Sequence, residues 1–418
     1  EMCIRDRPTL AVLLILIIIN VGPLYGRMQS AIDQVNRCIQ ENLTAIRVVK
    51  SYVRGDYEVE KFGVVNENLK SESEKAFGTA VLNMPAMQFV MYGTILGILL
   101  IGGRLINEGQ MMIGQLTSFL SYVLLILNSL MMMSNVFLLM TRSLASAERI
   151  MEVIDEKIDI TDENAKDIAV AKGEIEFDHV WFKYKDTAKE YVLSDVSFHI
   201  KPGQTVGIIG QTGSSKTTLV QLIPRLYDVT KGEVKIDGIN VKEYPVRHLR
   251  DAVAMVLQKN TLFSGSLIDN LRWGNENATL DEIKEACQIA CVDEFVDRLA
   301  DGYDTEMGQE GVNVSGGQKQ RICIARAILK KPKVLILDDS TSAVDTATEA
   351  KIRSGLAEKL PDMTKIIIAQ RISSVRHADQ IIIMDRGHVE AIGTHESLLR
   401  DNQIYQEIYA SQKEGADL

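Results

Sequence analysis

Two adjacent carboxylic acids, Asp338 and Asp339, directly follow the apolar run "VLIL". Such a run is typical of a buried strand, which would deliver both acids to one edge of a sheet. A second apolar run, "TVGII", leads into the loop "GQTGSSKTT", which begins at Gly210 and contains Lys216. Backbone N–H groups in loops of this kind bind phosphates, and carboxylates bind Mg²⁺. These residue types therefore predict a site for a metal–nucleotide complex.

The loop itself matches the phosphate-loop pattern with one exception. That pattern is Gly, four residues, Gly, Lys, and then Ser or Thr. Gly210, Lys216 and Thr217 fit, but Ser215 stands where the second glycine is expected. Taken alone, the match is also compatible with a plain Gly/Ser turn. The predicted nucleotide-binding residues of this segment are Gly210, Gly213, Ser214, Ser215, Lys216, Thr217 and Thr218.

Five further features argue against a plain turn, because they surround the loop in a regular order. The aromatic residue Tyr184 precedes the loop, and "VLQKN" follows it with Gln258. Next come "NVSGGQKQR", the paired acids and "SAVD", which ends at Asp345. This order resembles that of the ATP-binding cassette (ABC) family, and the resemblance extends from Pro8 to nearly the end of the chain. The "SGGQ" residues are Ser315, Gly316, Gly317 and Gln318.

The resemblance implies ATP and Mg²⁺ as cofactors and gives each motif a role. Tyr184 would stack on the adenine of ATP, although an aromatic residue at a strand end can also be purely structural. Thr217, Gln258 and Asp338 would hold Mg²⁺, and Gln258 would also sense the attacking water.

The resemblance also implies a partner subunit. In this family two nucleotide-binding domains enclose two ATP molecules, and each site joins the phosphate loop of one domain to the "SGGQ" of the other. Ser315 and the N-terminus of the helix after it would form a second anion site, which completes the partner's site. Asp345 would contact the same partner.

Two positions depart from the pattern of active family members. Those members have Glu after the metal-side Asp and His in "AHR", whereas this chain has Asp339 and, in "IAQRISS", Gln370. Asp is one methylene shorter than Glu, and a general base must lie within hydrogen-bond reach of its water. Gln370 can donate to a γ-phosphate but cannot carry a positive charge. With Asp339, Gln370 and Gln258 as its catalytic candidates, this site is expected to bind ATP and hydrolyse it weakly.

The "VSGGQ" segment, in contrast, is intact. This asymmetry predicts one half of a heterodimeric exporter of the multidrug or lipid type, paired with a half-transporter that carries Glu and His at the two positions. Two alternatives stay open at this point. One is a homodimeric exporter with slow hydrolysis, and the other is an ATP-binding regulatory or gating subunit of the membrane.

Three apolar segments precede these motifs. Residues 76–103 and 110–141 contain no charged residue, and each is long enough to cross a bilayer, which takes about 20 residues. Residues 10–19, "LAVLLILIII", form a shorter run that would also suit a buried helix or a signal peptide. Together they predict three transmembrane helices in the cytoplasmic membrane of a bacterium, with the nucleotide-binding domain in the cytoplasm. The resemblance identifies them as helices four to six of a six-helix exporter domain.

The connection at about 27–75 is long and charged. Apolar residues recur in it at spacings of three and four, which is typical of an amphipathic helix. The resemblance implies that the segment 42–54 couples the membrane part to a nucleotide-binding domain of the partner. A solvated extension of the membrane helices would show the same periodicity. The apolar residues are Val35, Ile39, Leu43, Ile46, Val49 and Val53.

The expected fold class is a partial α-helical transmembrane domain followed by an α/β P-loop nucleotide-binding domain with an antiparallel β subdomain. Residues 1–7, "EMCIRDR", are interpreted as a non-native adapter translation. The transmembrane part is expected at 8–155, a linker at 156–172 and the nucleotide-binding domain at 173–418.

The composition further limits the class of protein to which this chain can belong. The net charge of −10 disfavours a nucleic-acid partner, because phosphate binding needs clustered Lys and Arg. The acidic charge and the apolar segments exclude a soluble DNA-repair ATPase with the same cassette. Cys287 and Cys291 are four residues apart, but no further metal ligands lie near them, so small apolar core residues are the favoured interpretation. The exported substrate cannot be read from these residues.

Overall fold

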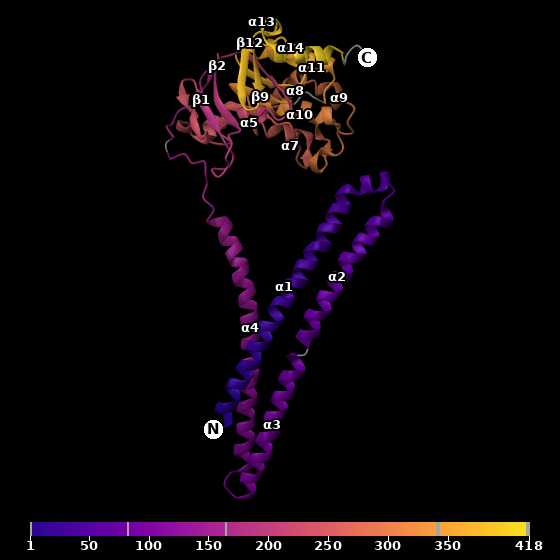
Figure 1. Ribbon diagram of the computed structural model, residues 1–418, viewed down its shortest axis with the longest axis vertical. Helices are drawn as coiled ribbons and strands as arrows, with labels where there is room; N and C mark the ends of the chain where they lie inside the picture. The colour runs from indigo at the N-terminus through magenta and orange to yellow at the C-terminus, as the bar shows by residue number, and fades with distance from the viewer. Residues whose placement is uncertain (1, 82, 164, 340–342, 415–418) are drawn as a thin grey trace. The chain divides into compact units, whose positions relative to one another are not determined.

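The computed structural model describes residues 2–81, 83–163, 165–339 and 343–414 (Figure 1). The chain divides into two compact units, Glu1–Glu156 and Lys157–Leu418. The N-terminal unit is helical, and the C-terminal unit combines sheets with helices.

The N-terminal unit is built from long helices. α1 and α2 lie side by side over much of their length, and Asn42 Nδ2 on α1 donates to Glu58 Oε2 on α2 at 3.0 Å. α3 and α4 approach each other closely at Gly102, where an added Cβ would lie 2.3 Å from Cδ1 of Leu116. The helices of this unit are α1 (Met2–Ser51), α2 (Gly55–Val81), α3 (Asn83–Asn107) and α4 (Ile113–Ile154).

The membrane span predicted at 10–19 lies within α1. The span predicted at 76–103 covers the end of α2 and most of α3, and the span predicted at 110–141 begins shortly before α4. In the part of the chain that the structure describes, no helix is both long and apolar enough to cross a membrane. The connection predicted at about 27–75 is helical: it contains the last part of α1 and most of α2, which join at residues 52–54. The expected amphipathic helix is the last part of α1, where Leu43 is 71% exposed, and Val53 beyond it is 87% exposed.

The C-terminal unit contains a six-stranded sheet with the order β12-β11-β3-β10-β9-β6. β12 pairs antiparallel with β11, and the remaining pairs are parallel. The apolar runs seen in the sequence form the central strands, and every residue of β9 and β10 is buried. The strands are β3 (Thr205–Gly210), β6 (Val253–Val256), β9 (Val334–Asp338), β10 (Thr364–Ile368), β11 (Gln380–Asp385) and β12 (His388–Gly393).

A four-stranded antiparallel sheet with the order β2-β1-β4-β5 forms the second layer of this unit. Its apolar face is buried, and the rings of Phe177 and Phe198 stack across β1 and β2 at 4.5 Å between centroids. The strands are β1 (Ile175–Phe182), β2 (Leu193–Ile200), β4 (Lys231–Ile236) and β5 (Ile239–Asn240), and a separate short pair consists of β7 (Gly265–Ser266) and β8 (Glu306–Met307). This is the α/β layout with an antiparallel part that the sequence predicts.

Helices and short 3-10 turns cover the sheets (Figure 1). Cys287 and Cys291 lie in the buried core of this unit as free thiols, which agrees with their interpretation as apolar core residues. The helices are α5 (Lys216–Gln221), α6 (Val246–Ala252), α7 (Leu267–Arg272), α8 (Leu280–Ile289), α9 (Asp293–Val296), α10 (Gly316–Leu329), α11 (Thr346–Lys359), α12 (Ile372–Val375), α13 (His395–Asp401) and α14 (Gln403–Glu414), and the 3-10 turns are η1 (Val241–Glu243), η2 (Gly302–Asp304) and η3 (Gln309–Gly311).

The register of the central strands gathers the chemically important segments. Ile368 at the end of β10 pairs with Ile208 of β3 on one side and with Asp338 of β9 on the other. Because parallel strands end at the same edge of a sheet, the segments that follow β3, β10 and β9 emerge side by side. They are the phosphate loop, the segment with Gln370 and the segment with Asp339.

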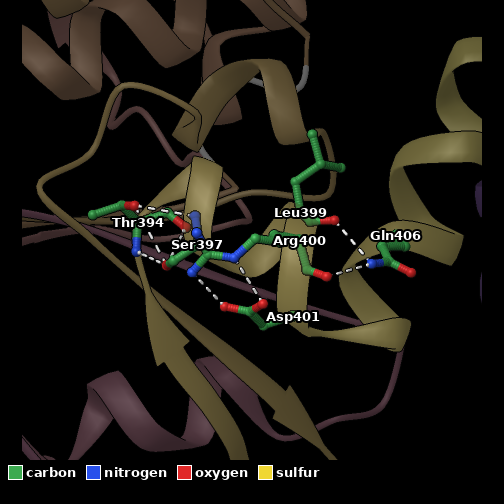
Figure 2. Close-up of polar contacts among 6 residues, drawn as sticks. All are labelled: Thr394, Ser397, Leu399, Arg400, Asp401 and Gln406. Atoms are coloured by element: carbon green, nitrogen blue, oxygen red, sulfur yellow. Dashed lines mark hydrogen bonds and ion pairs between the residues drawn. The ribbon is translucent and has the colours of Figure 1, made fainter.

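The chain returns to the sheet through α13 and α14 at its C-terminal end. Thr394 caps α13 in a reciprocal pair with Ser397, and Arg400 forms an ion pair with Asp401 (Figure 2). Gln406 on α14 donates through its side-chain nitrogen to the carbonyls of Leu399 and Arg400, at 2.9 and 3.1 Å (Figure 2). These carbonyls belong to the last turn of α13, so Gln406 caps that helix and fixes the start of α14.

Candidate active site

The phosphate loop connects β3 to α5 and uses left-handed backbone at two positions. Gly213 has φ +84°, and Ser215, the N-cap of α5, has φ 70° and ψ 22°. A side chain with a Cβ adopts this conformation at a cost of about 1–2 kcal/mol. Ser215 therefore adopts a left-handed conformation that glycine adopts without this cost.

Gly210 is required at the start of the loop for a different reason. An added Cβ would lie 2.1 Å from the carbonyl oxygen of Met384 and 2.7 Å from Oγ of Ser214. The first of these atoms is backbone of the neighbouring strand β11 and cannot move aside. The close packing of β3 and β11 thus excludes every side chain larger than hydrogen at this position.

Lys216 lies over its own loop. Its Nζ donates to the carbonyls of Gly210 and Gln211, both at 2.8 Å, and to Ser214 Oγ at 3.1 Å. Burial lowers the pKa of Lys216 below its ordinary value, and the nearby carboxylates of Asp339 and Asp338 only partly offset this. The loop thus places one half-buried cation beside two acids.

Thr217 and Asp338 form the oxygen-rich part of the site. Thr217 Oγ1 donates to Asp338 Oδ1 at 3.1 Å. Asp338 is 1% exposed, and its second oxygen, Oδ2, is buried without a hydrogen-bond partner among the described residues. Burial raises the pKa of the Asp338 carboxyl above its ordinary range, and the hydrogen bond from Thr217 works against this rise.

These oxygens fit Mg²⁺. A hydroxyl and a carboxylate with an unsatisfied oxygen are hard donors of the kind that this ion prefers. The described residues contain no group of three or more His, Cys, Asp or Glu side chains that could hold a metal ion. Mg²⁺ is usually held by one or two carboxylates together with substrate phosphates, and the pair Thr217 and Asp338 is sufficient for that arrangement.

Asp339 and Gln370, the two departures from the pattern of active members, contact each other directly. Gln370 Nε2 donates to Asp339 Oδ2 at 2.8 Å. The Asp339 backbone is left-handed, with φ 47°, and its N–H donates to the carbonyl of Ile368 at 3.0 Å. Burial raises the pKa of Asp339, and hydrogen bonds from Gln370 and Gln258 and the charge on Lys216 act in the opposite direction. The predicted catalytic residues therefore form one hydrogen-bonded group.

The predicted adenine contact, Tyr184, lies near the same loop. Its hydroxyl is 2.8 Å from Thr218 Oγ1, so the aromatic residue and the loop are directly linked. Half of its surface is exposed, and its ring meets that of Tyr227 edge to face at 5.1 Å between centroids. Tyr227 was missed in the sequence, although "RLYD" places an aromatic residue shortly after the loop helix.

The "SGGQ" segment forms the N-terminus of α10. Ser315 is the N-cap: its Oγ accepts from the Gln318 N–H at 3.3 Å, and Gln318 Oε1 accepts from the Ser315 N–H at 2.8 Å. Gly317 is packed against the loop that follows β9, since an added Cβ would lie 2.7 Å from the Ala343 carbonyl oxygen. Ser315 and Gly316 remain exposed. The segment is a capping box as well as a possible anion site.

Asp345 has a structural role of its own. It is the N-cap of α11, and its side chain accepts from the Thr348 N–H at 3.0 Å. These hydrogen bonds from Thr348 lower the pKa of Asp345 below its ordinary value. The predicted contact with a partner remains a prediction.

Both units of the chain match families of known proteins. Residues 193–342 match the ABC transporter family and residues 8–130 match the ABC transporter transmembrane region. The chain is 41% identical over 412 residues to the Bacillus subtilis ABC transporter ATP-binding protein YfiB, which covers 98% of this chain and 71% of that protein. The chain belongs to the ABC transporter family.

Two further similarities define this transporter more closely. It is 36% identical to the putative multidrug export ATP-binding/permease protein YgaD of Bacillus subtilis, over 94% of this chain and 69% of that protein. It also resembles the structure of a bacterial Atm1-family ABC exporter with ATP bound, with a TM-score of 0.87 and 27% identity, over 98% of this chain and 72% of that one. The transporter is thus a half of an ABC exporter, as its sequence predicts.

Membership in this family confirms the coarse functional predictions. The exporter half binds ATP, and the hydrolysis of this ATP is coupled to transport. ABC exporters act as dimers in the membrane.

Proposed function

We propose that this exporter half pairs with a different half, and that its own nucleotide site binds ATP but hydrolyses it weakly. The hydrogen bond between Gln370 and Asp339 carries the proposal. In this arrangement the carboxylate at the base position is one methylene short and is already held by a neutral amide. A base held away from its water by about 1 Å can lose on the order of a hundredfold in rate.

Binding of ATP at this site is supported by the phosphate loop and the residues around it. The backbone N–H groups of the phosphate loop and Lys216 would hold the phosphates, and Tyr184 would stack on the adenine. Thr217 and Asp338, with Gln258, would hold Mg²⁺, which supplies positive charge to the phosphates. Gln370 would donate its amide to the γ-phosphate.

The intact "SGGQ" segment would serve the partner's site. Ser315 and Gly316 are exposed at the N-terminus of α10, a helix of 14 residues whose first N–H groups can bind an anion. Together with Gly317 and Gln318 they would contact the γ-phosphate held by the partner's loop, and Asp345 would lie in the same interface. Hydrolysis at the partner's site would then drive transport.

The transporter is proposed to span the cytoplasmic membrane several times, with the nucleotide-binding domain, residues 173–418, in the cytoplasm. The segment 42–54, at the end of α1 and the turn after it, would dock on the partner's nucleotide-binding domain, because its apolar side chains Leu43, Tyr52 and Val53 are exposed. The name of the YgaD relative supports an exported compound of the multidrug class. A lipid is the other class that fits this type of exporter.

ATPase activity tests the pairing. The exporter half would be purified alone and together with a neighbouring half-transporter that carries Glu and His at the two catalytic positions. We expect slow hydrolysis by the chain alone and an increase of at least tenfold in the pair. Equal rates per nucleotide site in the two preparations would instead support a homodimer with slow hydrolysis.

A further inference from the structure

The C-terminal helix α14 reaches the segment that carries Gln370. Gln412, near the end of α14, donates through Nε2 to the backbone carbonyl of Gln370 at 2.7 Å. Its side-chain oxygen accepts from the backbone N–H of Ile372 at 2.8 Å. One amide group therefore holds both sides of a three-residue segment, in the way that a neighbouring strand would pair with it.

This contact satisfies a helix end that local residues leave open. Ile372 is the first residue of α12, and its N–H needs an acceptor from outside the helix. The N-cap of α12 is Arg371, whose side chain has donors only and makes no cap hydrogen bond. Gln412 supplies the missing acceptor from 40 residues further along the chain.

The position of Gln412 is itself fixed by the packing of α14. Tyr405 on this helix is fully buried, and its hydroxyl lies 2.8 Å from Nδ1 of His395 on α13. At its first turns, Gln406 caps α13 through the carbonyls of Leu399 and Arg400 (Figure 2). The helix is thus anchored to α13, and Gln412 extends from it to the Gln370 backbone.

We propose that Gln412 is a positioning residue for Gln370. Gln412 holds the Gln370 backbone, and the Gln370 side chain in turn holds Asp339 Oδ2. The C-terminal helix therefore determines where the Gln370 amide stands with respect to the γ-phosphate of ATP. This inference rests on the contact between Gln370 and the γ-phosphate that the proposed function assigns.

Discrimination between ATP and ADP tests this role, since ADP has no γ-phosphate. Affinities of both nucleotides with Mg²⁺ would be measured on the full chain in nanodiscs by competition with a fluorescent ATP analogue. We expect Gln412→Leu to weaken the affinity for ATP about fivefold to tenfold and to leave the affinity for ADP unchanged. An unchanged ATP affinity, or an equal loss for ATP and ADP, would overturn the proposal.

Two further variants make the test independent of folding. Gln412→Glu keeps the acceptor for Ile372 and loses the donor to Gln370, so it should also weaken ATP selectively, and it decides the question if the leucine variant does not fold. Gln403→Leu is the matched control on the same helix, because it removes an exposed side-chain hydrogen bond to Glu407 within α14 and not one that anchors the helix to α13. It should leave the ratio of ATP to ADP affinity unchanged.

Gln370→Ala separates this inference from the proposed function. If this variant does not change the ratio of ATP to ADP affinity, the γ-phosphate role of Gln370 is wrong. If it lowers the ratio and the Gln412 variants do not, only the positioning role of Gln412 is wrong.

Discussion

The phosphate loop shows how individual residues determine the site. Gly210 is needed because β11 leaves no room for a Cβ, whereas Gly213 is needed for its φ of +84°. Ser215 adopts φ 70° without being glycine. The sequence predicts a loop at this place from spacing alone, but it cannot show that Ser215 tolerates the left-handed conformation, because that depends on the surrounding packing.

The contact between Asp339 and Gln370 illustrates the same limit. The sequence shows both residues as departures, 31 positions apart, but it does not show that they contact each other. Their contact follows from strand order: β10 lies between β3 and β9, so the residues after β9 and β10 emerge together. Strand order in a parallel sheet depends on long-range pairing, which spacing in the chain does not reveal.

At Asp338 we expect function and stability to oppose each other. Burial raises the pKa of this carboxyl in the folded protein, so ionisation costs folding free energy. Asp338→Asn should raise the Tm without nucleotide by a few degrees at pH 8, and should remove most of the additional rise caused by Mg²⁺ with ATP. Thermal unfolding with and without Mg²⁺ measures both effects.

The stability of the Asp338→Asn variant relative to the wild type should also depend on pH. A raised folded pKa means that the stability contributed by protonated Asp338 is present at low pH and is lost as pH rises through the folded pKa. The stability difference between the Asn variant and the wild type should therefore shrink as pH falls. A difference that grows on acidification would contradict the burial effect.

At the scale of elements, two helix ends of this domain carry residues with a proposed second role. Ser315 of the "SGGQ" segment is the N-cap of α10, and Asp345 is the N-cap of α11. The capping box of Ser315 and Gln318 could have been read from the sequence as S-x-x-Q before a helix. The contact made by α14 could not, because Gln412 meets a backbone segment from a distant part of the chain.

Ser315→Ala should separate the two purposes of the α10 N-terminus. Loss of the cap should cost about 1 kcal/mol of stability. The same substitution should strongly reduce ATP hydrolysis by the assembled exporter, because Ser315 is proposed to complete the partner's site. Chemical unfolding and steady-state ATPase measurements check the two effects.

Thr279→Ala is the matched control, since Thr279 forms the same capping box with Glu282 at the start of α8. It should cost similar stability and leave the ATPase rate unchanged. Equal ATPase losses in the two variants would show that Ser315 acts only as a cap.

For the whole molecule, we propose an exporter with unequal nucleotide sites. The ABC fold and the order of its motifs could be predicted from the sequence, because each motif requires particular residue types at fixed positions. For the N-terminal unit, the apolar periodicity predicts a helix within the connection at about 27–75 and leaves open a solvated extension of the membrane helices. The structure has the adjoining parts of α1 and α2 there.

Hydrolysis at the chain's own site tests the central claim most directly. The exporter would be assembled with a partner half whose catalytic Glu is replaced by Gln, so that any turnover comes from the site with Asp339 and Gln370. We predict very slow hydrolysis at this site, and an increase on the order of a hundredfold when Asp339→Glu and Gln370→His are introduced together. Rapid hydrolysis before the substitutions, or no gain after them, would contradict it.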